Sequence, residues 1–256
     1  MDGLQFQTYQ KKNVVEFMET NKQEKLIGWT IPVLDHGFVR LIDWMGTDSR
    51  ICEAARLSYK SPSKGEEQDK KLLFYLYKMR HTSPFEQCVI TFNIRLPLFV
   101  QGQMVRHRTQ RLNQVSARYS EMKEEFYIPT KWRKQDIKNK QGSVETAELN
   151  HHALSFNLQQ WNDEAFDKYR LLLSMGVARE MARMVLPQNL YTEIYSQWDL
   201  HNLMHFFSLR LDEHAQWEIR QYAQSMFKIF EELYPWCSEA YHKFKLKMIN
   251  TTENIL

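Results

Sequence analysis

The sequence predicts an α+β fold: a mixed α/β layered domain with a central, largely antiparallel sheet flanked by long helices. Segments rich in β-branched and aromatic residues stand singly between segments whose apolar residues recur at helical spacing, and this alternation indicates stacked layers. The chain has 256 residues, enough for one sizeable core, and only 8 Gly and 7 Pro, so long unstructured linkers are not expected. We expect an N-terminal extension over residues 1–30 and a single domain over residues 31–256.

The first part of the chain predicts strands and helices in alternation. Residues 37–43 (GFVRLID) alternate well enough between apolar and polar side chains to form a strand. The leucines of residues 69–80 recur at helical spacing, and residues 87–96 (QCVITFNIRL) are rich in β-branched and aromatic side chains. The expected elements are a short helix at 14–20, a strand at 37–43, helices at 48–59 and 69–80, a strand at 87–96, and a helix at 98–107 that Pro97 opens.

The rest of the chain predicts a loop-rich stretch and then longer helices. A loop and a short strand should follow residue 107, up to Tyr127. Residues 131–142 are rich in charge and poor in apolar side chains, which predicts a mobile loop. The remaining expected elements are a long amphipathic helix at 145–174, a helix at 177–186 that Pro187 ends, a strand at 191–199, and helix over 200–244 with a break at Pro235.

The composition argues against several classes of protein. Lys and Arg number 34 against 31 Asp and Glu, and the net charge of +3 is too small to indicate nucleic-acid binding by itself. Cys52, Cys88 and Cys237 lack CxxC spacing, which argues against a disulfide framework or a zinc knuckle. The first residues lack a signal-peptide pattern, and no apolar run is long enough to span a bilayer. We therefore expect a cytoplasmic protein that binds neither membrane nor nucleic acid.

The most informative segment is Arg106–Ser120, which reads RHRTQRLNQVSARYS. It holds four arginines and His107 but no acid, with short hydrogen-bonding side chains between them. Arginine presents a planar, permanently charged fork that matches phosphate and carboxylate oxygens. Fixed cations mixed with neutral donors predict a site for an anionic ligand with a polar edge, such as a nucleotide. A nucleic-acid contact and a solvated basic turn are the alternatives.

Two further segments hold residues that could bind a ligand. His81–Glu86 (HTSPFE) joins a helix to a strand, where a side chain can be firmly held yet exposed. From these residues alone, a simple turn before Pro84 is the better explanation of Ser83. Arg183 lies on a mostly apolar predicted helix and needs an anionic partner, which is either a structural one such as Glu180 or a ligand.

A third segment places four polar residues on one helical face: His201, His205, Ser208 and Asp212. Two histidines at i and i+4 can ligate one zinc ion, and a zinc hydrolase that also uses Asp212 or His214 is therefore an alternative function. The catalytic Glu of the HExxH motif is missing, however, so we expect no metal. Arg210 lies between two leucines and should either extend to solvent or meet a ligand.

Two motifs resemble those of one protein family. Residues 106–108 (RHR), a gap of seven and Ser116 form the pattern RHR-x7-S, and Leu209–Glu218 (LRLDEHAQWE) forms a second, independent one. Over about residues 31–241 the chain resembles the flavin-dependent thymidylate synthases. The resemblance implies reductive methylation of dUMP to dTMP, with methylenetetrahydrofolate as carbon donor and NADPH-reduced FAD as hydride source. It further implies a homotetramer with active sites built between subunits and no nucleophile supplied by the protein.

The resemblance also assigns residues to each ligand. The implied dUMP contacts are Gln103, Met104, Val105, Arg106, Gln114, Val115, Ser116, Ala117, Arg118, Arg183 and Arg210. The implied FAD contacts are Ser83, Arg106, His107, Arg108, Gln114, Asp199, Leu200, His201 and His205. His81 would lie near the flavin and the folate. Arg210 is the expected catalytic residue, because its charge at the uracil edge would stabilise negative charge that develops as hydride reaches the ring.

The chain departs from the family pattern at a few of these positions. Gln114 stands where members often have Glu, which keeps a hydrogen-bonding end but removes a charge. Asp199, His201 and His205 replace the Asn, Arg and Asn of some members. Residues 1–30 and 131–142 lie outside the shared pattern.

Overall fold

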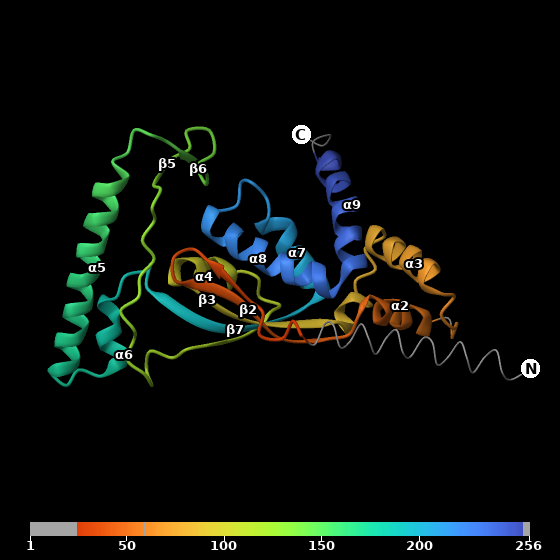
Figure 1. Ribbon diagram of the computed structural model, residues 1–256, viewed down its shortest axis with the longest axis horizontal. Coiled ribbons are helices and arrows are strands. Elements are labelled where there is room, and N and C mark those ends of the chain that lie inside the picture. Colours follow the sequence, from red (N-terminus) through yellow and green to blue (C-terminus); the bar gives the residue numbers. More distant parts are fainter. Residues whose placement is uncertain (1–24, 59, 253–256) are drawn as a thin grey trace, which may run out of the picture.

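A five-stranded sheet organises the chain in the computed structural model, which describes residues 25–58 and 60–252 (Figure 1). The strands follow the order β1-β2-β3-β7-β4, and every neighbouring pair is antiparallel. They span Thr30–Val33 (β1), Gly37–Met45 (β2), Val89–Pro97 (β3), Arg111–Gln114 (β4) and Tyr191–Asp199 (β7). The predicted α+β fold with a central antiparallel sheet is confirmed.

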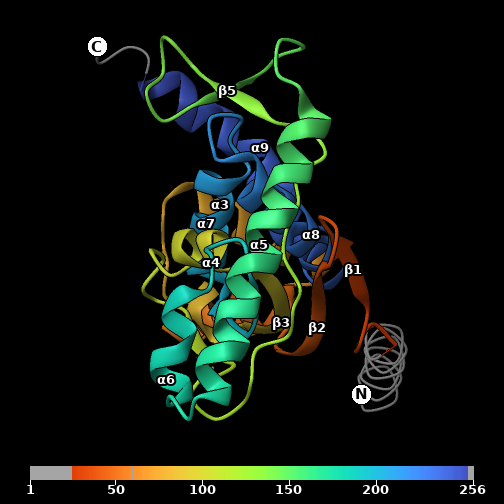
Figure 2. The same ribbon diagram turned by 90° about the vertical axis from the view of Figure 1, so that its left-hand side faces the viewer.

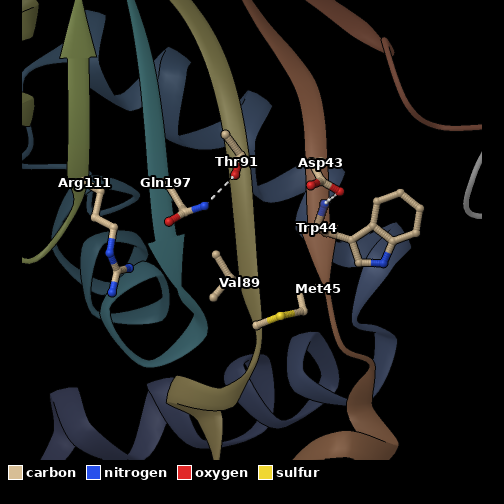
Figure 3. A pocket seen from close by; sticks show the side chains of 7 residues that line it. All are labelled: Asp43, Trp44, Met45, Val89, Thr91, Arg111 and Gln197. Carbon is tan, nitrogen blue, oxygen red and sulfur yellow. Dashed lines mark hydrogen bonds between the residues drawn. The ribbon is translucent and has the colours of Figure 1, made fainter.

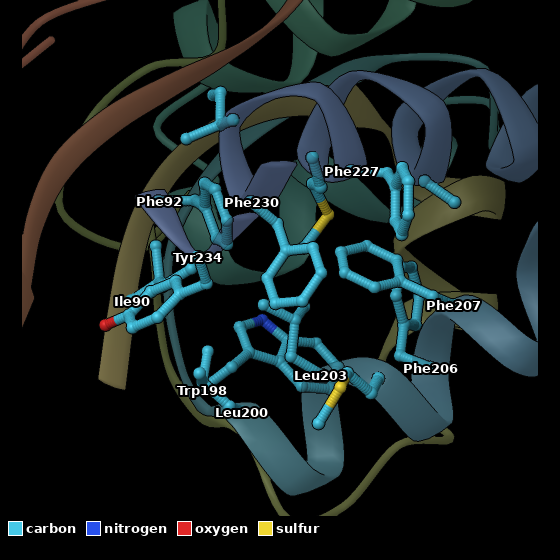
Figure 4. Packing of buried hydrophobic residues seen from close by; sticks show 14 of the residues in the cluster. Ile90, Phe92, Trp198, Leu200, Leu203, Phe206, Phe207, Phe227, Phe230 and Tyr234 are labelled. Carbon is cyan, nitrogen blue, oxygen red and sulfur yellow. The ribbon is translucent and has the colours of Figure 1, made fainter. Parts of the chain in front are cut away.

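The main core lies between one face of this sheet and a layer of helices. The layer contains α7 (Leu200–Arg210), α8 (Trp217–Leu233) and α9 (Pro235–Thr252), with α2 (Asp48–Leu57) and α3 (Glu66–Lys78) packed beside α9. Ile90 and Phe92 of β3 meet Trp198 of β7 and the rings of Phe207 and Phe230 (Figure 4). Antiparallel strands alternate their side chains between two faces, so the opposite face of the sheet carries the polar ones.

A second, smaller core lies beside this main one. It is built by α5 (His151–Ser174), α6 (Arg179–Ala182) and the single turn η2 (Arg183–Val185). Its buried residues are Phe126, Phe166, Tyr169, Ala182 and Leu190. In Figure 1 α5 lies along one side of the molecule, and Figure 2, which faces that side, shows α5 in front of the other elements.

The predicted loop at 131–142 and the start of the helix at 145 are wrong. β5 (Arg133–Gln135) and β6 (Ser143–Glu145) form a two-stranded hairpin, and α5 begins only at His151. The Gln135 Nε2 donates hydrogen bonds of 2.9 Å to the carbonyls of Lys140 and Gly142, which satisfies the polar backbone of the hairpin tip. Asn150 starts α5, because its Oδ1 accepts from the backbone N–H of Ala153.

Other predicted helices end or break earlier than expected. The helix that Pro97 opens is α4 (Leu98–Met104), three residues shorter than predicted, and the predicted helix at 177–186 reduces to α6 and η2. The helical region after residue 200 breaks at Pro235 as predicted, but also between Arg210 and Trp217, where the Asp212 carboxylate accepts from the backbone N–H of His214.

Most of the remaining predicted elements are confirmed. The strands expected at 37–43, 87–96 and 191–199 correspond to β2, β3 and β7, the helices expected at 48–59 and 69–80 correspond to α2 and α3, and the short strand before Tyr127 is β4. β1 and the turn η1 (Phe85–Gln87) were not expected. The short helix expected at 14–20 lies outside the described residues. Over the part that is described, no helix is both long and apolar enough to cross a membrane.

Gly37, at the start of β2, allows a close approach that a larger residue would prevent. A Cβ at this position would lie 2.1 Å from the Tyr222 hydroxyl and 2.6 Å from the carbonyl oxygen of Val33. We expect Gly37→Ala to lower the free energy of unfolding by about 1–3 kcal/mol, as overpacking does. Urea denaturation measures the change. Gly102→Ala in α4, where nothing lies within 4 Å of the added carbon, is the control and should be neutral or stabilising. Equal losses in both variants would contradict the steric account.

Candidate functional site

The arginine segment forms a turn between α4 and the edge strand β4. Met104 ends the helix, and the backbone N–H of His107 still donates to the Met104 carbonyl at 3.1 Å before the chain leaves toward β4. Within this turn His107 is buried, whereas Arg106 and Arg108 are exposed. The turn therefore holds one aromatic ring inward and presents cations outward.

Arg210, the last residue of α7, meets this turn from a distant part of the sequence. Its Nε donates to His107 Nε2 at 3.0 Å, and its Nη1 donates to Gln103 Oε1 at 3.4 Å. The His107 ring lies edge-on against Phe206 at 4.9 Å between centroids. Three of the predicted site residues, Gln103, His107 and Arg210, are thus in contact although 107 positions separate the first from the last.

The His107 side chain is held in its neutral form. A nitrogen that accepts a hydrogen bond from a guanidinium cannot itself carry a proton, so Nε2 is the bare nitrogen of the ring. Burial, the Arg210 charge and His205 lower the pKa of His107 to about 4. Burial also lowers the pKa of Arg210, which as an arginine remains cationic. A neutral ring therefore orients a fixed positive charge without competing with it.

The outward arginines of the turn lack acidic partners. Within residues 25–58 and 60–252, no carboxylate forms an ion pair with Arg106, Arg108 or Arg111. A solvated surface usually alternates charges of both signs. The lack of an acidic partner for Arg106 and Arg108 in the turn, and for Arg111 at the start of β4, favours a bound anion over the alternative of a simple basic turn.

A second group of predicted residues gathers around Glu180. The Arg118 Nε donates to Glu180 Oε2 at 3.0 Å, and the Arg183 Nε donates to the Glu180 backbone carbonyl at 3.3 Å. Ser116 Oγ accepts from the backbone N–H of Arg118 at 3.3 Å, and the side chain of Ala117 is buried. The Glu180 backbone carbonyl thus accepts from Arg183, whereas the Glu180 carboxylate accepts from Arg118. Two exposed arginines and a hydroxyl converge here.

Gln114, at the end of β4, joins the two neighbouring elements. Its Nε2 donates to Thr192 Oγ1 at 3.0 Å, and its Oε1 accepts from Gln101 Nε2 at 3.2 Å. Both ends of the amide are therefore used within the protein, by β7 and by α4. Gln114 makes both contacts as a neutral amide, without the charge of the Glu that family members often have at this position.

The residues expected near the flavin gather at the N-terminus of α7. Asp199 begins the helix: its Oδ1 accepts from the backbone N–H of Asn202 at 2.9 Å, and Oδ2 accepts from the Asn202 side chain at 2.7 Å. The Leu200 N–H donates to the Cys88 carbonyl, which brings η1 and the preceding Ser83 against this end. Both His81 and Ser83 are exposed. The turn after residue 82 closes through its backbone, so the Ser83 hydroxyl is not what forms it.

The histidine face of α7 does not assemble a metal site in the described chain. No group of three or more His, Cys, Asp or Glu side chains is placed to hold a metal ion there. Ser208 Oγ donates to the His205 backbone carbonyl, and the Asp212 carboxylate serves the turn after the helix. Ser208 and Asp212 therefore make contacts within the helix and in the turn after it.

The open face of the sheet carries a row of residues that sequence reasoning missed. Asp43, Thr91, Gln197 and Arg111 stand opposite one another on four adjacent strands. They line a pocket of about 410 Å³ together with Trp44, Met45 and Val89 (Figure 3). Gln197 Nε2 donates to Thr91 Oγ1 at 3.2 Å. The outward positions of the predicted strands were a usable signal, but the order of the strands was needed to align them.

Comparison with known proteins places the chain in a family. The family described as thymidylate synthase complementing protein matches residues 40–236. The flavin-dependent thymidylate synthase of Thermus thermophilus is 52% identical over 226 residues, which cover 88% of this chain and 83% of that protein. The chain belongs to the flavin-dependent thymidylate synthase family.

Further relatives agree with this assignment. The flavin-dependent thymidylate synthase of Treponema denticola is 46% identical over 223 residues, which cover 85% of this chain and 84% of that protein. Among solved structures, the UMP/dUMP methylase PolB from Streptomyces cacaoi, bound with 5-Br dUMP, has a TM-score of 0.76 and 31% identity. The match covers 84% of this chain and 98% of that one. The sequence motifs had therefore indicated the correct family.

The neutral state of His107 has a consequence for the stability of this protein. Because the pKa of His107 is about 4 when folded, against 6.5 ordinarily, acid below pH 6.5 protonates the unfolded chain first and destabilises the native state. We expect the unfolding free energy of the wild type, minus that of His107→Gln, to fall as the pH drops from 6.5 toward 4.

Urea denaturation of both proteins at several pH values measures this difference. Asp48, whose pKa burial raises to about 6, contributes the opposite slope, but equally in both proteins, so the subtraction removes it. A difference that stays constant between pH 7 and pH 5 would show that His107 is not kept neutral by the fold.

Proposed function

We propose that the protein is an FAD-dependent thymidylate synthase. It methylates dUMP reductively to dTMP, taking the carbon from methylenetetrahydrofolate and the hydride from FAD that NADPH has reduced. The observation that carries this assignment is the cationic Arg210 held by neutral His107, which exposed Arg106 and Arg108 flank in the turn, in a chain of this family. The relative solved with 5-Br dUMP supports a pyrimidine nucleotide as the substrate.

The group around Glu180 suits the phosphate of dUMP. We assign Arg118 and Ser116 to the phosphate oxygens, with Arg183 beside them, because exposed guanidinium and hydroxyl groups give charge-assisted hydrogen bonds to an anion. The phosphate would replace the Glu180 carboxylate as the partner of Arg118. Further dUMP contacts are proposed at Gln103, Met104, Val105, Arg106, Gln114, Val115 and Ala117. Met104 has a fully buried side chain, so its contact would use the backbone.

Arg210 is the proposed catalytic residue at the uracil edge. Two of the roughly five N–H groups of a guanidinium are used by His107 and Gln103, which leaves others for a substrate oxygen. A fixed, partly desolvated cation there stabilises negative charge that develops on the pyrimidine. All three cysteines are buried, and burial raises the pKa of Cys52 and of Cys88 to about 12, so neither thiol is suited to attack the ring.

The residues present fit a flavin nucleotide. Arg106 and Arg108 are exposed cations that suit its phosphates, and Ser83, His107, Leu200, His201 and His205 provide further polar or main-chain groups around them. Bound there, the cofactor supplies the hydride-transfer chemistry that no side chain can provide. The Asp199 carboxylate only accepts hydrogen bonds, so we assign it to hydroxyl or amino groups rather than to phosphate. Gln114 completes the proposed FAD contacts, and His81 is the folate candidate.

We propose a homotetramer whose active sites combine residues from two subunits. Glu180 lies on α6, which lies with α5 at one end of the molecule, whereas Arg210 ends α7 in the layer of helices that packs on the sheet (Figure 1). Apolar side chains are exposed around the Glu180 group: Val115, Tyr119, Met181 and Met184, the last of them 73% exposed. A second copy that covered these residues could bring its own Arg210 to the phosphate group.

The remaining assignments concern organisation and setting. We propose a single domain over residues 31–256 preceded by an extension over 1–30, small-molecule substrates as the only ligands besides the partner subunits, and a cytoplasmic location. Three unpaired thiols support a reducing compartment. The arginines divide between two separate groups rather than forming one continuous basic face, which disfavours the nucleic-acid alternative.

The visible spectrum of the protein with FAD, under anaerobic conditions, tests the proposed function. NADPH should bleach the flavin absorbance near its visible maximum, and reoxidation should require both dUMP and methylenetetrahydrofolate, with dTMP formed in equal amount. Failure to bind flavin, or reoxidation by either substrate alone without dTMP, would contradict the assignment.

The same experiment isolates Arg210. In Arg210→Ala, NADPH should still bleach the flavin, but reoxidation by the two substrates should slow by about 10²–10³-fold, the loss typical of one removed electrostatic donor. Arg50→Ala removes an exposed arginine that pairs with Glu53 on α2 and should react like the wild type. Reoxidation of Arg210→Ala within a few-fold of the wild type would remove this residue from the chemistry.

Mixing two inactive variants tests the shared active site. Arg118→Ala and Arg210→Ala should each be inactive as homotetramers. Co-expressed, they should regain part of the activity, because a site that takes Arg118 from one subunit and Arg210 from the other would be intact in some mixed tetramers. The control is the homotetramer of the Arg118→Ala, Arg210→Ala double variant, which lacks both arginines in every site and should stay inactive. No recovery in verified mixed tetramers would place both arginines in one subunit's site.

A further inference from the structure

A buried polar chain connects the core of the protein to the turn that carries His107. Gln110 Nε2 donates to the carbonyls of Met104 at 2.8 Å and of His107 at 3.1 Å. Gln110 Oε1 accepts from Ser196 Oγ at 2.6 Å, and Ser196 Oγ accepts from Trp198 Nε1 at 2.7 Å. Ser196 and Trp198 are fully buried on β7. We call this set of contacts the Gln110 clamp.

The direction of these hydrogen bonds is determined by the indole. Trp198 Nε1 can only donate, so the Ser196 oxygen is its acceptor and the Ser196 proton points elsewhere, to Gln110. The amide oxygen of Gln110 is thereby engaged, and its NH₂ group must face the two carbonyls. Each donor and acceptor of the chain has one possible role, so the amide cannot reverse without leaving buried groups unpaired.

The clamp acts on His107 from two sides. Its Gln110 end fixes the backbone just before and at His107, where α4 has ended and no regular hydrogen bonds continue. Its Trp198 end belongs to the aromatic cluster with Phe206 (Figure 4), and both of these rings lie against the His107 ring, at 6.1 and 4.9 Å between centroids. Backbone and ring are thus held by one connected set of residues.

We propose that Gln110 is a positioning residue for the reaction: through the clamp it holds His107, and through His107 it aims the Arg210 guanidinium. Gln110, Ser196 and Trp198 are not among the proposed ligand contacts, so the effect of Gln110 is indirect. The proposal rests on the proposed role of Arg210, but its first test does not require turnover.

The test compares Gln110→Glu with the wild type in the full-length protein. The carboxylate keeps the size of the side chain but loses the donors, and it would face two carbonyl oxygens. In the protein without substrates, ¹³C-histidine NMR, with the His107 signal assigned from His107→Gln, should show the His107 pKa rising from about 4 toward its ordinary value as the ring becomes less buried. In FAD-loaded enzyme, kcat should fall by about 10–100-fold, as for a misplaced catalytic group, with a smaller change in KM for dUMP.

Gln135→Glu is a matched control. Gln135 also donates its side-chain NH₂ to loop carbonyls, but in the β5–β6 hairpin, away from Arg210. The Gln135→Glu variant should leave the His107 titration and kcat unchanged. Gln110→Met, which removes the donors without adding charge, should behave like Gln110→Glu and covers the case in which the carboxylate prevents folding.

The outcomes separate the clamp from the proposed function. An unshifted His107 titration in both Gln110 variants, or a kcat within two-fold of the wild type, would overturn the positioning role. A shifted titration in a protein whose wild type makes no dTMP would leave the clamp as a device that holds His107 and would refute the thymidylate synthase assignment instead.

Discussion

The pairing of β7 with β3 on one side and β4 on the other is the constraint on which both halves of the site depend. β3 and β7 pair along their whole length, from Val89 with Asp199 to Pro97 with Tyr191, although about a hundred residues separate them. One end of this pairing brings η1 against the start of α7, and the other leads into α4 and the arginine turn. β4 then returns along β7 and places Gln114 beside Thr192. Four segments distant in sequence meet because one long antiparallel ladder holds them in register.

The positive charge of Arg210 is preserved because its hydrogen-bond partners are neutral. Arg210 carries a permanent charge, and its nearest polar neighbours, His107 and Gln103, are neutral acceptors rather than carboxylates. An acid in either place would have neutralised the guanidinium and reduced its effect on an anionic substrate. At the Glu180 group the protein does the opposite: Arg118 has a carboxylate partner, but an exposed one, and exposed ion pairs are weak enough to be exchanged. Arg210 thus has neutral hydrogen-bond partners, whereas Arg118 has a carboxylate partner that a phosphate can replace.

The strands and the helices with strong periodicity could be predicted from the sequence, because burial on one face imposes a repeat that the residues display. β5 and β6 could not, since three-residue polar strands have no such repeat and are held by side-chain contacts such as those of Gln135. The arginine motif could be proposed as an anion site from its residues, and the family resemblance proposed Arg210 as a ligand contact. Their contact through His107 could not, because it depends on how α7 ends relative to α4. The contacts of Gln110 and Ser196 could not be predicted for the same reason. Nothing in their residue types indicates that the two side chains meet each other and the indole of Trp198.

The small core beside α5 is a separate cluster with far fewer buried apolar residues than the main core. Arg183 and the Glu180 backbone belong to elements that pack on Phe166 and Tyr169, whereas Arg210 belongs to the large aromatic core. A unit with fewer buried apolar contacts opens at a lower free energy, and its amide hydrogens exchange sooner. On the proposed phosphate assignment, a nucleotide held by this unit binds only its closed form, so bound nucleotide raises the free energy of opening α5 and α6 by mass action. On that assignment, the order of α5 and α6 depends on the nucleotide concentration.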